Sequence, residues 1–457
     1  MNDGPSPSMP SLGAYDRFFL ASSLALLKKG LPGHHVFAQL ALRGPLDLHR
    51  MRTRLMQILD HHPVLRARIE CSRITKQPRW TVQSDAAMER VVRSSLQPEE
   101  LVVIDLRDPA TDRDAILRAA AQEQINPFEG PLIRLWVFQI ADDRHDLVLR
   151  WPHHLMDLTG AERLLAELGS EEGQATIDSP DAPSLGFRRS LAAWCRGMWQ
   201  LRQVNFLKGN RLKAATNGEP LTVETLRLAW TPEQSAAIDA AARASCAPGP
   251  MLHTRWQIAS LVRAVDAVFA RADVHRREHY LVSLPQRRDP PMRRDAIAGN
   301  DLTIGTLILH RDTLTNPHAA DAALVSQLAD HARRGLDDAN ERATAFAGRF
   351  PLPVYAWLLG RFRIFPRYSI GFTAYRADDM AGGFLGCTVE DMTTWVVPTS
   401  PPGILAAFCR FRDRLSFSLT YFSNACPPTI AFDICNEMNL QLGATGLVCN
   451  PKHPPAP

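Results

Sequence analysis

The chain has 457 residues, of which 45% are hydrophobic and 22% are charged. These fractions are typical of a globular protein and exclude a largely disordered or fibrous chain. The net charge of +4 is small for this length and no long run of basic residues occurs, so composition does not favour a nucleic-acid-binding protein.

The length predicts two to three domains, each with a hydrophobic core of its own. No apolar stretch is long enough to cross a membrane, and the first residues lack a secretory signal, so we expect a cytoplasmic protein without a membrane span. The eight cysteines form no C-x-x-C pair, which favours reduced thiols over a zinc site or a disulfide framework.

Residues 1–12 are rich in Pro, Ser and Gly and predict a flexible tail. Residues 13–168 alternate strand and helix patterns, which predicts an N-terminal lobe built around one sheet. Asp47 is expected to cap the first long helix of this lobe, and Pro63 to stop it. The expected strands are Val36–Leu42, Val102–Leu106, Leu132–Ile140 and Asp146–Trp151, the last two forming a hairpin, and the expected helices are 48–62 and Ala115–Gln124.

Residues 169–185 are polar and predict a surface linker, which leaves 186–457 as a C-terminal lobe. The same rhythm of strands and helices returns there, so two similarly built α/β lobes are expected. The expected helices are Leu191–Phe206, Pro232–Ala244, His253–Arg271 and Pro428–Leu442, and the expected strands are Glu224–Trp230, Tyr280–Leu284, Leu302–Leu309, Ile404–Phe411 and Leu415–Phe422.

The segment from Trp151 to Asp157 carries the clearest chemical signal, because His153 precedes Asp157 by four residues. Thr159 and Glu162 form a capping-box pattern, which predicts that a helix begins at the far side of the loop. His153 would then lie at a strand-to-helix junction, where catalytic side chains are frequent. The alternative from the residues alone is that His153 and His154 are structural histidines satisfied by hydrogen bonds.

Other histidine patterns favour structure over chemistry. His61 and His62 precede Pro63 at a helix end, where cations interact well with the last carbonyls. His275 and His279 have helical spacing, but two arginines lie between them and the H-E-x-x-H glutamate is absent. The sequence therefore predicts no metal ion and no prosthetic group.

Several segments together resemble the condensation-domain superfamily, the acyltransferases related to chloramphenicol acetyltransferase. The resemblance implies an α/β (α+β) fold of two such lobes, each a mixed sheet covered by helices, with an active-site tunnel between them. The matching segments follow the family's order along nearly the whole chain: Gly44–Asp47, His62–Ala67, Asn126–Phe128, Gly130–Arg134, His153–Asp157, Gly299–Asn300 and Pro401–Gly403.

The family pattern at the active site is H-H-x-x-x-D-G. Aligned on Asp157, the catalytic histidine is His153, while Pro152 replaces the first histidine and Leu158 replaces the glycine. A one-residue deletion in the loop would put His154 in the catalytic position instead. The family's Asp-Phe-Gly-Trp-Gly motif is absent, which is typical of a divergent, free-standing acyltransferase.

The resemblance also implies roles for these groups. His153 would act as the general base, and Asp157 would pair with an arginine, for which Arg287 and Arg288 are candidates. The backbone N–H of Asp157 or of Leu158 would stabilise the oxyanion.

The implied activity is transfer of an acyl group from a thioester to a hydroxyl or amine, which forms an ester or amide in specialised-metabolite or lipid biosynthesis. The donor would be acyl-coenzyme A or an acyl carrier protein with its phosphopantetheine arm, used by a monomeric enzyme. The alternative is a catalytically inactive scaffold that binds a carrier protein or an acyl chain, because Pro152 and Leu158 depart from the pattern.

Overall fold

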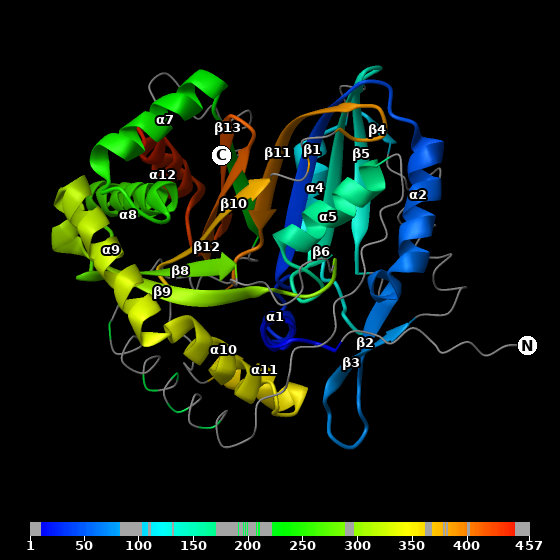
Figure 1. Cartoon of the computed structure of the whole chain (residues 1–457), viewed down its shortest axis with the longest axis horizontal. Coiled ribbons are helices and arrows are strands. Elements are labelled where there is room, and N and C mark those ends of the chain that lie inside the picture. The colour runs from blue at the N-terminus through cyan, green and yellow to red at the C-terminus, as the bar shows by residue number, and fades with distance from the viewer. Residues whose placement is uncertain are drawn as a thin grey trace, which may run out of the picture.

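The structure is a computed structural model in which two lobes lie side by side (Figure 1). Residues 1–10 of the expected tail, 171–185 of the expected linker, most of the helix expected at 191–206, Arg288 and Pro401–Pro402 lie outside the described residues. The structure describes residues 11–82, 103–107, 111–129, 132–170, 191, 195, 197, 199, 207, 209–210, 222–287, 297–361, 368–377, 380, 383–399 and 403–443.

The first lobe is built on a mixed sheet with the strand order β11-β1-β6-β5-β4. Its centre is an antiparallel pair in which His35 of β1 lies opposite Pro152 of β6. The hairpin β5–β6 forms as predicted, and β4 adds to β5 in parallel. The strands are β1 (His35–Arg43), β4 (Val103–Asp105), β5 (Arg134–Ala141), β6 (Arg144–Pro152) and β11 (Thr388–Val396).

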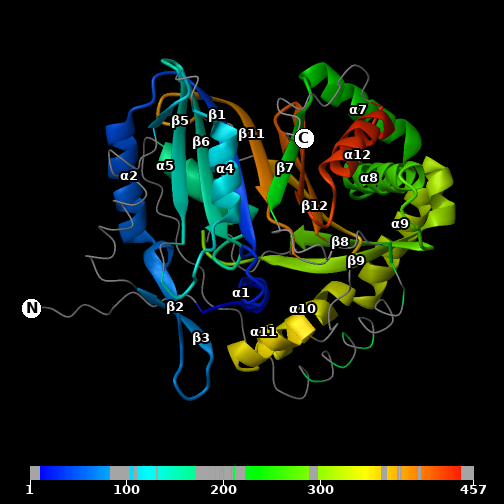
Figure 2. The same cartoon turned by 180° about the vertical axis from the view of Figure 1, so that it is seen from behind.

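Helices cover both faces of this sheet. Helices α2 (Leu48–His61) and α5 (Leu158–Gly169) lie on one face, and α4 (Arg113–Gln122) lies on the opposite face (Figures 1 and 2). The carboxylate of Asp47 accepts a 2.9 Å hydrogen bond from the backbone N–H of Arg50, so the predicted cap of α2 is confirmed.

Strand β11 comes from the C-terminal half of the chain but pairs with β1 of the first lobe. Residues 388–396 therefore cross from the expected C-terminal lobe into the N-terminal sheet. Another unpredicted element, helix α1 (Ala14–Leu27), packs against helices α10 (Leu336–Ala347) and α11 (Leu352–Arg361) of the C-terminal half. Both connections join the two lobes.

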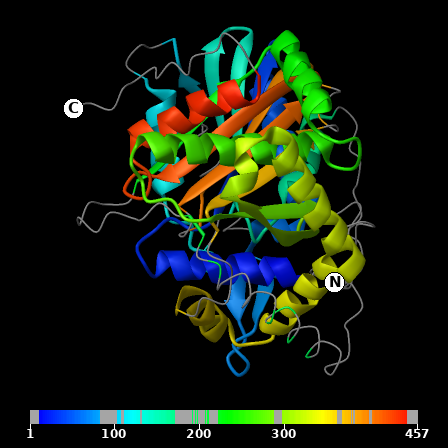
Figure 3. The same ribbon diagram turned by 90° about the vertical axis from the view of Figure 1, so that its left-hand side faces the viewer.

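The second lobe contains a six-stranded mixed sheet with the order β7-β13-β12-β10-β8-β9. In Figure 3 its helices α8 and α12 lie side by side across this sheet, and the two helices are in contact. The strands are β7 (Val223–Ala229), β8 (His279–Arg287), β9 (Leu302–His310), β10 (Ile370–Ala377), β12 (Ile404–Phe411) and β13 (Arg414–Phe422), and the helices are α7 (Pro232–Ser245), α8 (Leu252–Arg271), α9 (Pro317–Arg334) and α12 (Pro428–Gln441).

Each lobe has its own apolar core. Among the described residues, no helix is both long and apolar enough to cross a membrane. The mixed α/β architecture in two lobes confirms the predicted fold class. The small elements are the hairpin β2 (Ala67–Cys71) and β3 (Pro78–Val82) and the 3-10 turns η1 (Pro63–Arg66) and η2 (Arg311–Thr315).

Candidate active site

The candidate site is the loop that joins β6 to α5. The buried indole of Trp151 donates a 2.9 Å hydrogen bond to the carbonyl of Met156, and this bond closes the loop on itself. A helix begins at the far side of the loop, as predicted, but the capping box at Thr159 is wrong, because α5 begins at Leu158. Asp157 is the cap, since its carboxylate accepts from the N–H of Gly160 at 2.9 Å. Asp157 thus ends the loop that contains His153.

A second segment, residues 297–301, lies against this loop. Its Gly299 forms a β-bridge with Met156, accepts from the N–H of Asp157 at 3.2 Å and donates to the carbonyl of Leu155 at 2.7 Å. The Gly299–Asn300 pair that resembles the family is therefore a structural partner of the His153–Asp157 loop. The two stretches are far apart in sequence and meet at the junction of the lobes.

Asn300 determines which ring nitrogen of His153 carries the proton. The amide Nδ2 of Asn300 donates to the carbonyl of His153 at 2.8 Å and to Oδ1 of Asp16 at 2.9 Å. Both partners only accept, so the amide oxygen must face Nδ1 of His153, which lies 3.0 Å away. Nδ1 is therefore the protonated nitrogen, and Nε2 carries the free lone pair.

Asp16 of α1 holds this amide in place. Its side chain is 1% exposed, and its carboxylate accepts from the backbone N–H of Asn300 at 2.8 Å and from that of Gly13 at 2.7 Å. A buried carboxylate with several N–H donors keeps a fixed position. Asp16, Asn300 and His153 thus form a chain of hydrogen bonds that runs from α1 to the loop.

Aromatic rings fix the plane of the His153 imidazole. It stacks on Phe19, with ring centroids 3.8 Å apart, and on His34, with centroids 5.1 Å apart. Its backbone N–H donates to the carbonyl of His34 at 2.9 Å. His153 is partly exposed, and its Nε2 has no hydrogen-bond partner among the described residues. Nε2 is thus the ring atom that a substrate can reach.

Burial keeps this imidazole neutral. The low-polarity surroundings lower the pKa of His153 to about 4, although the hydrogen bonds to its own carbonyl and to Asn300 oppose the shift. Burial, together with the neighbouring His153, lowers the pKa of His34 to about 3. At neutral pH, His153 therefore presents an unprotonated Nε2 and can accept a proton.

His154, the alternative catalytic residue, lies in a different environment. It is 1% exposed and stacks on Trp80 of β3, with ring centroids 6.1 Å apart. Within the part of the chain that the structure describes, neither of its ring nitrogens has a hydrogen-bond partner, and burial lowers its pKa to about 3. His154 is a core residue in this conformation, so the geometry favours His153 as the base.

Among the described residues, Asp157 contacts backbone groups and does not pair with Arg287. Besides capping α5, its carboxylate accepts from the N–H of Asp301 at 3.1 Å. Within the described residues no arginine forms an ion pair with it; Arg287 is exposed at the end of β8, and Arg288 is not described. Asp157 still fixes the loop, because it ties α5 to the segment 297–301 by backbone hydrogen bonds.

His61 and His62 lie at the C-terminal end of α2, as expected. Nδ1 of His61 is 2.7 Å from the carbonyl of Gln57 at the end of α2. Nε2 of His62 is 3.1 Å from the carboxylate of Glu167, so this buried pair joins α2 to α5. These contacts are structural.

Gly160 allows the close approach of α5 to the segment 297–301. A Cβ atom at this position would lie 2.0 Å from the carbonyl oxygen of Ile297. We therefore expect Gly160→Ala to push this segment away from the loop and to lower the free energy of unfolding by about 2–3 kcal/mol, measured by urea denaturation. Gly360→Ala in α11 is the matched control, because its Cβ would make an ordinary 3.6 Å contact with Ala25 of α1. Equal stability of the two variants would contradict the close packing.

The chain resembles known proteins in structure but not in sequence. No protein-family model matches the sequence, and no curated protein matches it. Among solved structures, the chain is similar to a trichothecene 15-O-acetyltransferase from Fusarium sporotrichioides, at 13% identity and a TM-score of 0.64, over 95% of this chain and 94% of that chain.

Two further solved structures are similar over their whole length. One is a mutant of the starter condensation domain of rhizomide synthetase in complex with C8-CoA, at 14% identity and a TM-score of 0.60, over 96% of this chain and 95% of that chain. The other is a wax ester synthase/diacylglycerol acyltransferase from Marinobacter aquaeolei VT8, at 14% identity and a TM-score of 0.57, over 95% and 100%. The chain has the condensation-domain fold, related to that of chloramphenicol acetyltransferase.

Proposed function

We propose that this protein is an acyltransferase that moves an acyl group from a thioester to a hydroxyl or amine acceptor. The observation that carries the proposal is the geometry of His153, a partly exposed residue whose Nδ1–H is fixed by Asn300 and whose Nε2 carries the free lone pair. A positioned, neutral imidazole is the side chain most often used as a general base.

The reaction requires one proton to move in each direction. Nε2 of His153 takes the proton from the hydroxyl or amine of the acceptor, whose oxygen or nitrogen bonds to the thioester carbonyl carbon. The tetrahedral intermediate then collapses, the C–S bond breaks, and the leaving sulfur takes the proton back from the imidazolium. The products are an ester or amide and a free thiol, and His153 is again neutral.

The negative oxygen of the tetrahedral intermediate needs a hydrogen-bond donor. The Asp157 N–H, which the sequence suggested, already donates to Gly299. The N–H of Leu158 is the first of α5 and has no partner among the described residues, so we assign it this role. The Leu158 side chain packs against the core of the first lobe.

The donor follows from the same chemistry. Two similar structures are named as an acetyltransferase and a wax ester synthase, and a third holds C8-CoA. We propose an acyl thioester of coenzyme A as the donor. The alternative donor is the same acyl thioester on the phosphopantetheine arm of an acyl carrier protein. No metal or prosthetic group takes part in the proposed steps, because the imidazole supplies the base.

The test is release of free thiol from a panel of acyl-coenzyme A and acyl-carrier thioesters, with alcohols and amines as acceptors. We expect thiol release that depends on the acceptor. A folded chain that retains an acyl carrier on a column but releases no thiol with any donor would instead favour the scaffold.

The pH profile should reflect the low pKa of His153. Because its pKa is lowered to about 4, the base stays unprotonated well below the ordinary value of 6.5. We expect kcat/KM to be level from about pH 8 to about pH 5.5 and to fall as the pH approaches 4. A half-maximal value near pH 6.5 would contradict a buried, neutral base.

Stability in the same buffers is the necessary control. The pKa values of His34 and His154 are about 3 in the folded chain and 6.5 in the unfolded chain, so the unfolded chain binds protons first as the pH falls. Their contribution to stability is complete above pH 6.5 and is lost on acidification. The two residues together account for a loss of about 4 kcal/mol between pH 7 and pH 5. The lowered pKa values of His35 and His153 add to it, so we expect urea denaturation to show a loss of at least about 4 kcal/mol.

A further inference from the structure

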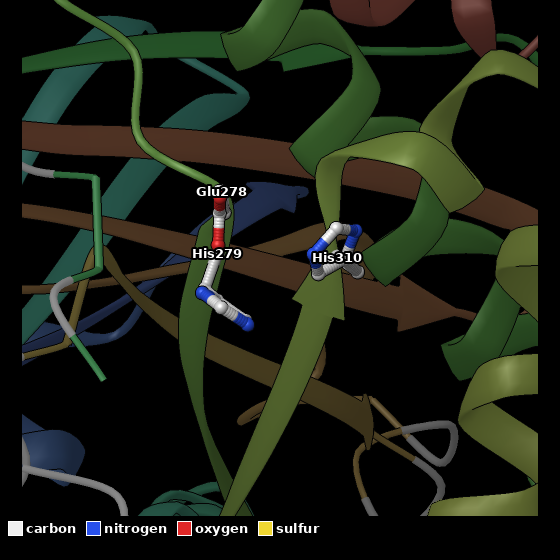
Figure 4. A group of neighbouring side chains, drawn as sticks. All are labelled: Glu278, His279 and His310. Carbon is white, nitrogen blue, oxygen red and sulfur yellow. The ribbon is translucent and has the colours of Figure 1, made fainter. Parts of the chain in front are cut away.

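Strands β8 and β9 bring three metal-binding side chains together at one end of the pair. They are Glu278, His279 and His310, whose ligand atoms all lie within 4.8 Å of one another (Figure 4). The imidazole rings of His279 and His310 meet edge to face, with centroids 4.9 Å apart. The sequence did not predict this cluster, because His310 lies on a separate strand, far in sequence from the His275–His279 pattern.

The backbone around these side chains is held in place. His279 and His310 are directly opposite each other in the antiparallel register. The carbonyl of Glu278 accepts from the N–H of Arg311 at 2.8 Å, and the carbonyl of His279 accepts from the N–H of Asn210 at 2.8 Å. A fixed cross-strand pair positions two ligands before an ion binds, which lowers the entropic cost of forming a site.

Two imidazole nitrogens and one carboxylate oxygen are a typical ligand set for zinc, completed by water. Zinc-to-ligand distances of about 2.1 Å in a tetrahedron put neighbouring ligands about 3.4 Å apart. The present separations need to shrink by about 1.4 Å at most, which small side-chain rotations accomplish, because Glu278 is exposed. The cluster is thus open enough to close around an ion.

The charges nearby are partly balanced. Two groups of Asp312 contact Nδ1 of His310: a carboxylate oxygen at 3.2 Å and the backbone N–H, which donates to this nitrogen at 3.4 Å. These contacts orient the ring, so Nε2 is the nitrogen that we assign to the metal. The guanidinium of Arg276 pairs with Asp266 at 3.4 Å. Arg277 and Arg311 contribute positive charge beside the cluster, so Glu278 and Asp312 are needed to offset it.

We propose that Glu278, His279 and His310 bind one zinc ion or a similar divalent transition metal. The ion joins the open ends of β8 and β9, opposite the end at which Arg287 pairs with Leu302. His310 lies ten residues along the chain from Asn300, or roughly 30 Å along an extended strand, so the metal stabilises the second lobe and does not enter the chemistry at His153.

The test is zinc titration calorimetry on the full chain, purified without a polyhistidine tag and stripped with a chelator. We expect one zinc ion per chain and a rise in unfolding temperature when zinc is added. His279→Ala and His310→Ala should each weaken zinc binding by about tenfold or more. Glu278→Gln should weaken it less, because Glu278 is exposed and glutamine keeps the size of its side chain.

The matched control is His318→Ala, which removes an exposed histidine on α9 and should leave zinc binding unchanged. Cobalt(II) absorption in the visible range reports tetrahedral coordination independently. Circular dichroism shows that each variant is folded. The proposal would be overturned if the wild-type chain showed no saturable zinc binding, or if His279→Ala and His310→Ala bound zinc as tightly as the wild-type chain.

Discussion

His153→Ala is expected to lower kcat for thiol release by about 1,000-fold, within the range of 100- to 10,000-fold that a general base contributes. The variant removes the imidazole and with it Nε2, the ring nitrogen that has no hydrogen-bond partner within the described residues. KM should change little, because the base acts on the proton of the acceptor and not on binding of the donor. The measurement is steady-state thiol release by the wild-type chain and the variant at matched folded concentration.

His154→Leu is the discriminating control for this prediction. Because both ring nitrogens of His154 lack hydrogen-bond partners, a buried apolar side chain of similar volume should cost little stability and change kcat by no more than about threefold. The assignment fails if His153→Ala keeps wild-type activity. It also fails if His154→Leu is the inactive variant of the two.

The second large effect is expected for Asn300→Ala. Removal of the amide leaves Nδ1 of His153 without its 3.0 Å partner, so the ring can turn or carry its proton on Nε2, where it is useless as a base. We expect kcat to fall by about 10- to 100-fold with KM nearly unchanged. That corresponds to about 1.4–2.7 kcal/mol, as for loss of a hydrogen bond to a buried group.

Asn300 acts by positioning the His153 ring, so its test also needs a measurement of the ring itself. Nitrogen-15 NMR of the imidazole should report protonation at Nδ1 in the wild-type chain and a mixture of tautomers in Asn300→Ala. Asn340→Ala is the matched control, because it removes an amide on α10 that bonds the carbonyl of Ile304 and leaves His153 untouched. A wild-type tautomer ratio and kcat in Asn300→Ala would show that the amide does not orient the base.

Local patterns predicted most of the elements because they depend on neighbours in sequence. The strand Ile404–Phe411 has the bounds that apolar alternation indicates, and Asp47 caps its helix as a short-range rule requires. The helix α5 was predicted, but its capping residue was not, for a specific reason. Both Asp157 and Thr159 are good N-cap residues, and Asp157 is favoured because its second oxygen also accepts from Asp301, a residue far away in sequence.

The partners of His153 could not be predicted, because they come from segments that no local rule connects. Asp16 and Phe19 are on a helix that the sequence pattern did not reveal, and His34 precedes β1. Asn300 was part of the resemblance, but the sequence favoured a turn or packing role for it, and nothing local linked it to His153. Strand β11 shows the same limit, since its pairing with β1 depends on a crossover from the other half of the chain.

The central claim is transfer of an acyl group to an acceptor, as distinct from hydrolysis of the thioester. The direct measurement is mass spectrometry of reactions that contain the purified chain, an acyl-coenzyme A or acyl-carrier donor, and a hydroxyl or amine acceptor. The account predicts an acceptor heavier by the acyl group, formed in an amount equal to the thiol released, and absent with His153→Ala. A free acid as the sole acyl product, or the same yield with His153→Ala, would contradict it.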